Sequence, residues 1–290
     1  MVRKVINLIL TPLCFLAIII YGIFLVIAVG FALVSSAIVL PYLSTYQWVF
    51  FVLIPIPIGI FPVEGPLLML YYAFVIFVIL FSFIWLVKSK KRADNFITLA
   101  QVFLATLFFM HIYYWLLTVF GISYEVPHFE EWRFEKYIFS ITNACFHEEL
   151  VARVLLLGLP LLFVHAIIGR AKRVGNYLLG GNLEVDGAAT FFLILSSLIF
   201  ACAHFLLGWD IYKILPTFVA GLALGYLFLK FGLYLSILLH LSFNYLGVVL
   251  GALGSLAPLI VTIIRSFLLF IGFVYFLKWL RKGTKFYLKI

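Results

Sequence analysis

The chain has 290 residues, of which 66% are hydrophobic and only 11% are charged, and its mean hydropathy is +1.24. Average soluble domains have about 45–50% apolar and about 25% charged residues. So few charges could not cover so large an apolar core in water. This excludes a soluble domain, a disordered chain, a coiled coil and collagen, and it predicts an all-α polytopic membrane protein. The formal net charge of +9 indicates basic loops at the cytoplasmic face rather than a nucleic-acid partner.

Eight apolar stretches are long enough to cross a bilayer, which takes roughly 20 residues. In chain order they cover residues 6–30, 66–87, 95–119, 137–168, 188–207, 211–230, 233–253 and 257–280. The first stretch is too long for a signal peptide, so we expect it to remain as a span. We expect one membrane domain over 1–290, with N-terminal spans in 1–120, a protease core at about 137–253 and a last span at 257–280.

The segment 31–65 is also apolar, but its structure does not follow from the sequence. It is interrupted by four prolines, Pro41, Pro55, Pro57 and Pro62. An extension of the first span, a re-entrant segment and an interfacial segment all fit this pattern. The run from Pro62 through Glu64 to Pro66 is typical of a turn.

Basic residues gather on one side of this arrangement of spans. They precede the first span, follow spans two, four and six, and end the chain, at positions 3–4, 88–92, 170–173, 230 and 281–289. The loop at 120–136, on the opposite side, is acidic. The positive-inside rule therefore predicts an integral, multi-pass protein with both termini in the cytoplasm.

Two pairs of glycines have the spacing Gly-x-x-x-Gly. Gly221 and Gly225 lie in the sixth span, and Gly247 and Gly251 lie in the seventh. This spacing lets the backbones of neighbouring helices approach closely, so we interpret both pairs as packing sites.

Ionisable side chains inside the spans are costly and usually face a cavity or a partner. Three spans hold most of them, together with one amide: His147, Glu148, Glu149, Arg153, His204, His240 and Asn244. A single histidine in an apolar helix is usually a hydrogen-bonded core residue, and we interpret His111 and His165 in this way. We expect Arg265 to pair with an acid or to reach the membrane surface.

The spacing of these residues indicates their partners. Glu149 and Arg153 are four residues apart, so they can form an ion pair on one helix face. Glu148 points about 100° away from that pair. His240 and Asn244 are also four residues apart and can reach the same point.

This set of side chains is suited to activating water against a carbonyl. Arg153 can keep Glu149 charged. Glu148, which is outside that ion pair, can then act as a general base. The two histidines can orient a water or donate to an oxyanion, and Asn244 can donate through its amide. One such pair alone would be explained as structural, but three sets in three spans favour a catalytic site.

At these residues the chain resembles the CAAX protease and bacteriocin-processing family, whose eukaryotic branch comprises the CAAX prenyl protease 2 enzymes. The three motifs stand in the family's order as Glu148-Glu149-Leu-Val-Ala-Arg153, Phe200-Ala-Cys-Ala-His204 and His240-Leu-Ser-Phe-Asn244. The resemblance covers about residues 140–250. Many members have an aromatic residue before the arginine and a glycine after it, where this chain has Ala152 and Val154. That departure affects substrate preference more than chemistry.

The resemblance implies a glutamate-dependent intramembrane endopeptidase that needs no metal. In the implied mechanism, Glu148 is the base that activates water, and His204 helps to hold that water. His240 and Asn244 form the oxyanion hole. Glu149 and Arg153 support these residues. The implied substrate is a protein prenylated on the cysteine of a C-terminal Cys-a-a-X sequence, which loses its last three residues. Its prenyl chain would enter sideways from the membrane lipid.

Other functions remain open at this point. A zinc protease is the nearest alternative function. The zinc motif His-Glu-x-x-His is not complete, because residue 151 is valine. A different zinc site is open, because His204, His240 and Glu148 are acceptable ligand types. A nucleophilic Cys145 or Cys202 has no feature that would activate its thiol. A transporter would also place Glu and His in the membrane, yet no inverted repeat is visible. Loss of a motif residue would have favoured a noncatalytic scaffold, and none is lost.

The predicted orientation bears on the substrate. It places Glu148 and His204 toward the outer side of the membrane, whereas a Cys-a-a-X protein is cytoplasmic. Maturation of another membrane-associated or exported peptide, of the bacteriocin type, is therefore the alternative function.

Overall fold

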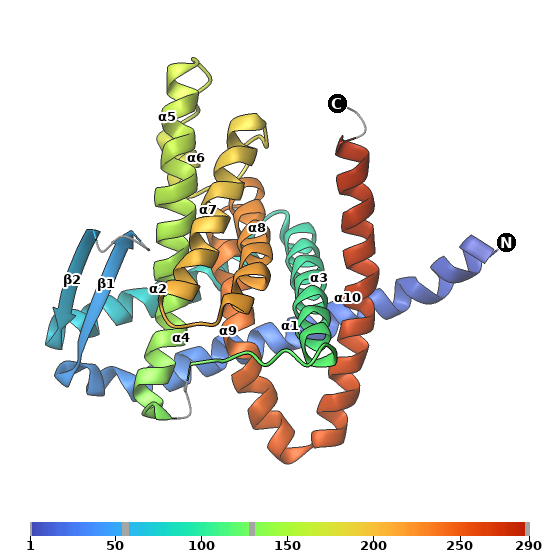
Figure 1. The fold of residues 1–290 in the computed structure, drawn as a ribbon, viewed down its shortest axis with the longest axis horizontal. Coiled ribbons are helices and arrows are strands. Elements are labelled where there is room, and N and C mark those ends of the chain that lie inside the picture. The colour runs from blue at the N-terminus through green and yellow to red at the C-terminus, as the bar shows by residue number, and fades with distance from the viewer. Residues whose placement is uncertain (1, 54–57, 128–130, 288–290) are drawn as a thin grey trace. The chain divides into compact units, whose positions relative to one another are not determined.

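The computed structural model describes residues 2–53, 58–127 and 131–287 (Figure 1). It is 84% helical, and eight of its described helical segments are long and apolar enough to cross a membrane. They are Leu10–Thr45, Gly65–Lys88, Arg92–Val119, Phe134–Ile167, Gly187–Leu206, Ile211–Lys230, Leu233–Ser255 and Pro258–Arg281. The predicted all-α class and the eight spans are confirmed, and the chain is an integral, multi-pass membrane protein.

The chain divides into two compact units. Unit 1 contains residues 1–28, 93–123 and 246–290, and unit 2 contains residues 29–92 and 124–245. All the candidate site residues from Glu148 to Asn244 lie in unit 2. The expectation of one membrane domain over the whole chain stays a prediction.

Unit 2 contains the helices that carry the candidate site. Its main elements are α2 (Gly65–Lys88), α4 (Phe134–Glu149), η3 (Leu150–Gly158), α5 (Leu159–Ile167), α6 (Val174–Leu178), α7 (Gly187–Leu206), η4 (Ile211–Lys213), α8 (Ile214–Lys230) and the first half of α9 (Leu233–Leu256). In Figure 1, α7 and α8 lie side by side, and α7 also packs on η3.

The fourth span consists of three consecutive helical segments. The α-helix α4 ends at Glu149 and continues as the π-helix η3, which is followed by α5. A π-helix is rare and wider than an α-helix, and it is frequently found at functional sites. Here it begins directly after the two adjacent glutamates, so the helix widens where the polar residues of this span lie.

The segment 31–65 combines a helix extension with a hairpin. Helix α1 (Val2–Val39) runs past the first predicted span and is followed by the 3₁₀ helix η1 (Leu40–Thr45). Strands β1 (Gln47–Leu53) and β2 (Ile58–Glu64) then pair antiparallel, with Gln47 opposite Glu64. Pro55 and Pro57 lie outside the described residues. The turn predicted at 62–66 is wrong in most of its length, because Pro62 and Glu64 belong to β2. Only Gly65, whose φ of +57° favours glycine, marks the change from strand to helix.

Unit 1 is held together by aromatic packing. It contains the first part of α1, α3 (Arg92–Val119), the end of α9 and α10 (Pro258–Tyr287). The rings of Tyr21 and Phe103 lie 4.8 Å apart between α1 and α3, and those of Phe108 and Phe273 lie 5.2 Å apart between α3 and α10.

Arg265 in unit 1 has a neutral partner. A guanidinium N–H of Arg265 donates to His111 Nδ1 at 3.2 Å. The sequence led us to expect an acid or the membrane surface for Arg265, and an interhelical contact with an imidazole was not foreseen. His111 forms the expected hydrogen bond but is partly exposed, so its interpretation as a core residue is wrong.

The two glycine pairs differ in their surroundings. A Cβ on Gly221 would lie 3.0 Å from Ser197 Cβ and 3.1 Å from its Cα, so α8 approaches α7 closely at this point. A Cβ on Gly247 or Gly251 would meet no heavy atom within 4 Å. The packing role is confirmed at Gly221, but it is wrong for the pair in α9, which lines an apolar cavity of about 540 Å³ within unit 1.

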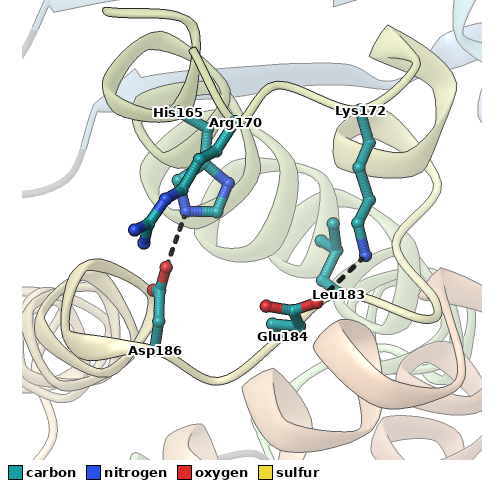
Figure 2. A pocket seen from close by; sticks show the side chains of 6 residues that line it. All are labelled: His165, Arg170, Lys172, Leu183, Glu184 and Asp186. Carbon is teal, nitrogen blue, oxygen red and sulfur yellow. Dashed lines mark hydrogen bonds and ion pairs between the residues drawn. The ribbon is translucent and has the colours of Figure 1, made fainter. Parts of the chain in front are cut away.

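A polar cluster joins the end of α5 to the start of α7 (Figure 2). His165 is buried, with Nδ1 2.9 Å from the Tyr177 hydroxyl and Nε2 3.0 Å from Asp186 Oδ2. Asp186 also caps α7 by accepting from the Ala189 N–H at 2.8 Å. Burial acts to raise the pKa of Asp186, but this hydrogen bond, His165 and Arg170 together hold it below its usual value. His165 is therefore a hydrogen-bonded core residue, as the sequence predicted.

Candidate active site

Glu149 is the centre of a buried hydrogen-bond network at the end of α4. Its side chain is fully buried, and its Oε2 accepts from Arg153 Nε at 3.2 Å. The hydroxyl of Ser236 on α9 donates to the same oxygen. The other oxygen, Oε1, lies 2.9 Å from His240 Nδ1. The predicted ion pair with Arg153 is present. The contacts of Glu149 with Ser236 and His240 also join the fourth span to α9.

Glu148 has a different environment from its neighbour. Its Oε2 is buried and has no hydrogen-bond partner among the described residues. It faces two imidazoles, with His240 Nε2 at 3.7 Å and His204 Nε2 at 3.9 Å. These distances exceed a direct hydrogen bond and are within the range that a bridging water can span. Three spans thus bring one carboxylate and two ring nitrogens together.

The hydrogen bonds of both histidines determine their orientation. His204 Nδ1 lies 2.9 Å from the Phe200 carbonyl oxygen, which can only accept, so this nitrogen carries a proton. His240 Nδ1 donates to Glu149, whose charge is compensated by Arg153. In both rings Nε2 is the nitrogen that is turned toward Glu148.

Phe200 explains the aromatic residue of the second motif. Its ring centroid lies 4.8 Å from that of His204 and 6.1 Å from that of His240, in both cases edge to face. The Arg153 guanidinium lies 5.3 Å from the same ring, as a cation–π contact requires. Phe200 therefore positions both histidines and covers the buried arginine.

Asn244 lies on α9, one turn after His240, but its amide is turned toward α4. Its Nδ2 donates to the Ile141 carbonyl at 3.0 Å and lies 3.6 Å from Cys145 Sγ. Both N–H bonds of the amide thus have partners in α4. The role of Asn244 as an oxyanion donor stays a prediction, and it requires one of these contacts to be released.

Three residues near the site were not foreseen from the sequence. Ser236 was detectable, because Ser236, His240 and Asn244 follow each other at intervals of four on α9. Trp209 and Lys213 were not, because they lie in and after the turn between α7 and α8. The Trp209 ring lies 6.4 Å from His204, and Lys213 Nζ lies 4.0 Å from the centre of the Trp209 ring.

A comparison with known families identifies this part of the chain. The family model described as type II CAAX prenyl endopeptidase, Rce1-like, matches residues 113–246. That range contains all three motifs and every residue of the buried network. Residues 113–246 are similar to the Rce1-like family. At the level of this family, the match supports a CAAX-type intramembrane protease.

The other comparisons and the remaining candidates add less to the Rce1-like assignment. No curated protein and no solved structure matches the chain. Cys145 is buried, and its Sγ lies 3.1 Å from the Ile141 carbonyl, so the thiol faces its own helix. No three His, Cys, Asp or Glu side chains cluster as metal ligands within the described ranges. Independence from metal stays a prediction.

Proposed function

We propose that this Rce1-like protein is a glutamate-dependent endopeptidase that removes the C-terminal tripeptide of prenylated Cys-a-a-X proteins. The observation that carries the mechanism is the buried Oε2 of Glu148, which no described residue hydrogen-bonds and which faces Nε2 of His204 and His240. A carboxylate oxygen that is buried without a hydrogen-bond partner is costly, so such an atom usually has a functional reason.

The protonation of the two histidines supports separate roles in the proposal. If both rings were neutral, the site would present three acceptors, namely Glu148, His204 Nε2 and His240 Nε2. One water has only two hydrogens to donate, so one acceptor would be left without a donor. An additional proton on His240 resolves this, because the Glu149 carboxylate 2.9 Å from Nδ1 stabilises an imidazolium. His240 then donates from Nε2, while neutral His204 accepts from the water.

The proposed reaction follows from these roles. Glu148 takes a proton as the water oxygen attacks the scissile carbonyl carbon, and the developing oxyanion accepts from His240 Nε2–H. When the tetrahedral intermediate collapses, the C–N bond breaks and Glu148 passes the proton to the leaving amine. The products are a prenylated protein with a new C-terminal carboxylate and a free tripeptide.

The test uses the purified protein in detergent and a farnesylated Cys-a-a-X peptide, with mass spectrometry of the released tripeptide. We expect Glu148→Gln to lower the rate at least about 100-fold, because general-base catalysis is lost. The substitution keeps the size of the side chain and removes no hydrogen bond that a described residue makes. Melting temperature in the same detergent serves as the control for folding.

Each outcome of this test has a distinct meaning. Release by Glu148→Gln at the wild-type rate would contradict the proposed mechanism. Release that stops when a chelator is added would show a metal enzyme instead. Absence of release from the prenylated peptide by wild-type protein would contradict the proposed substrate, and an exported peptide would be tested next.

A further inference from the structure

Lys213 is a cation at the site that the proposed mechanism does not use. It ends the 3₁₀ helix η4 and is partly exposed. It interacts electrostatically with both Glu148 and His204. No carboxylate lies within 4.0 Å of its ammonium group among the described residues, so its charge is not used in an ion pair. Arg153, the other cation near the site, is fully buried and committed to Glu149.

The turn after α7 holds Lys213 in this position. Gly208 has a φ of +96°, which favours glycine and reverses the chain direction. The backbone N–H of Trp209 then donates to the His204 carbonyl at 3.1 Å, and the indole ring lies 6.4 Å from the His204 ring. Asp210 caps η4 by accepting from the Tyr212 N–H at 3.0 Å. The ammonium group of Lys213 rests on the Trp209 ring at 4.0 Å.

The geometry points to Lys213 as the residue that binds the C-terminal carboxylate of the substrate. This inference rests on the proposed function, in which cleavage occurs three residues from the C-terminus. Three extended residues span at most about 10–11 Å. The path from Glu148 to Lys213 runs through His204 at 3.9 Å, the Trp209 ring 6.4 Å further on, and the ammonium group 4.0 Å beyond it. These contacts together exceed the length of the tripeptide, but the water between Glu148 and the scissile cysteine carbonyl and the hydrogen bond to Lys213 each add about 3 Å. A tripeptide whose amino end follows that carbonyl can therefore place its carboxylate at Lys213.

A role of Lys213 in tuning Glu148 makes a different prediction. A lysine that only stabilises the Glu148 carboxylate would affect the hydrolysis of every substrate alike. A lysine that binds a carboxylate affects only substrates that have one. Comparing a peptide acid with the matching peptide amide separates the two roles.

The experiment measures kcat/KM for a farnesylated Cys-a-a-X peptide as the free acid and as the C-terminal carboxamide, with the purified full-length protein. We expect the wild type to prefer the acid about 10- to 100-fold, the range of a charge-assisted hydrogen bond. Lys213→Gln should lower kcat/KM for the acid by that factor and leave the amide within about twofold. Lys213→Arg should restore most of the preference. Lys230→Gln, at the opposite end of the same span, is the matched control and should keep the wild-type ratio.

The outcomes distinguish this inference from the proposed function. Wild-type protein that cleaves acid and amide equally would overturn the role of Lys213 and leave the protease function standing. A Lys213→Gln variant that folds but loses both activities equally would also overturn it, in favour of an effect through Glu148. No cleavage of either peptide by wild type would overturn the proposed function and this inference with it. A wild-type ratio near one overturns the role of Lys213 even where a variant fails to fold.

Discussion

Two adjacent glutamates with the same side chain have opposite environments in this site. Glu149 accepts from Arg153, Ser236 and His240, and it is fully buried. Glu148 lies one residue earlier, on another face of the helix, and its Oε2 has no hydrogen-bond partner in the described part of the chain. One glutamate is thus built into the fold, and the other is left for chemistry.

Substitution of each glutamate by glutamine should separate stability from activity. Glu149→Gln leaves the Arg153 charge buried without a counter-charge, which costs about 3–5 kcal/mol in buried pairs. We therefore expect a lower melting temperature in detergent together with lost activity. Glu148→Gln should lose activity and melt close to the wild-type temperature. A Glu149→Gln variant that melts like the wild type would show that the network does not stabilise the fold.

At the scale of residues, the sequence predicts pairs within one helix better than contacts between helices. The ion pair of Glu149 with Arg153 follows from their spacing of four. The Asn244 amide could not be placed in the same way, because its partner Ile141 is on another span. The link from His240 to Glu149 likewise depends on how α9 packs against α4, which the spacing within α9 does not contain.

At the scale of elements, hydropathy predicted where the chain crosses the membrane but not every local conformation. The residues of β1 are apolar and aromatic, as in a span, so composition alone could not separate a strand from a continued helix. The π-helix η3 is rich in leucine and valine, which also suit an ordinary helix. It packs against α7, and such tertiary contacts are not visible in the sequence.

The two glycine pairs offer a matched test of helix packing. A Cβ on Gly221 would press on the Cβ and Cα of Ser197, so Gly221→Ala should push α7 and α8 apart and cost about 1–3 kcal/mol. Gly251→Ala meets no atom within 4 Å and should be neutral, or stabilising by up to about 1 kcal/mol through helix propensity. Melting temperature in detergent measures both. Equal stability of the two variants would contradict close packing at Gly221.

At the scale of the molecule, hydrogen bonds between loops show which loops of unit 2 lie on the same side. Each bonded pair of loops is separated in the chain by an even number of membrane crossings. The Glu125 N–H donates to Asp210 Oδ2 at 3.1 Å, so the loop before α4 and the loop after α7 lie on one side. The Asn182 N–H donates to the Lys230 carbonyl at 3.1 Å, which joins the loop before α7 to the turn after α8. These contacts agree with the alternation of basic and acidic loops that the sequence shows.

The absolute orientation of these two sides is the remaining prediction, and a matched pair of exposed valines can test it. Val126 is 53% exposed in the acidic loop, and Val174 is 54% exposed beside the basic cluster at 170–173. Under the positive-inside rule, we expect an impermeant thiol reagent to label Val126→Cys in intact cells and Val174→Cys only after permeabilisation. The native Cys14 and Cys145 are buried, and unsubstituted protein corrects for any labelling of Cys202.

The result also bears on the substrate, because Asp210 and the nearby Lys213 lie on the side of the Val126 loop. Labelling of Val126→Cys from outside would place the Lys213 end of the site outward, so a cytoplasmic C-terminus would have to reach it through the bundle. In that case a comparison of prenylated and unprenylated peptides decides between the proposed Cys-a-a-X substrate and the exported-peptide alternative. Labelling of Val174→Cys from outside would instead contradict the predicted orientation and open the Lys213 end to the cytoplasm, where Cys-a-a-X proteins are found.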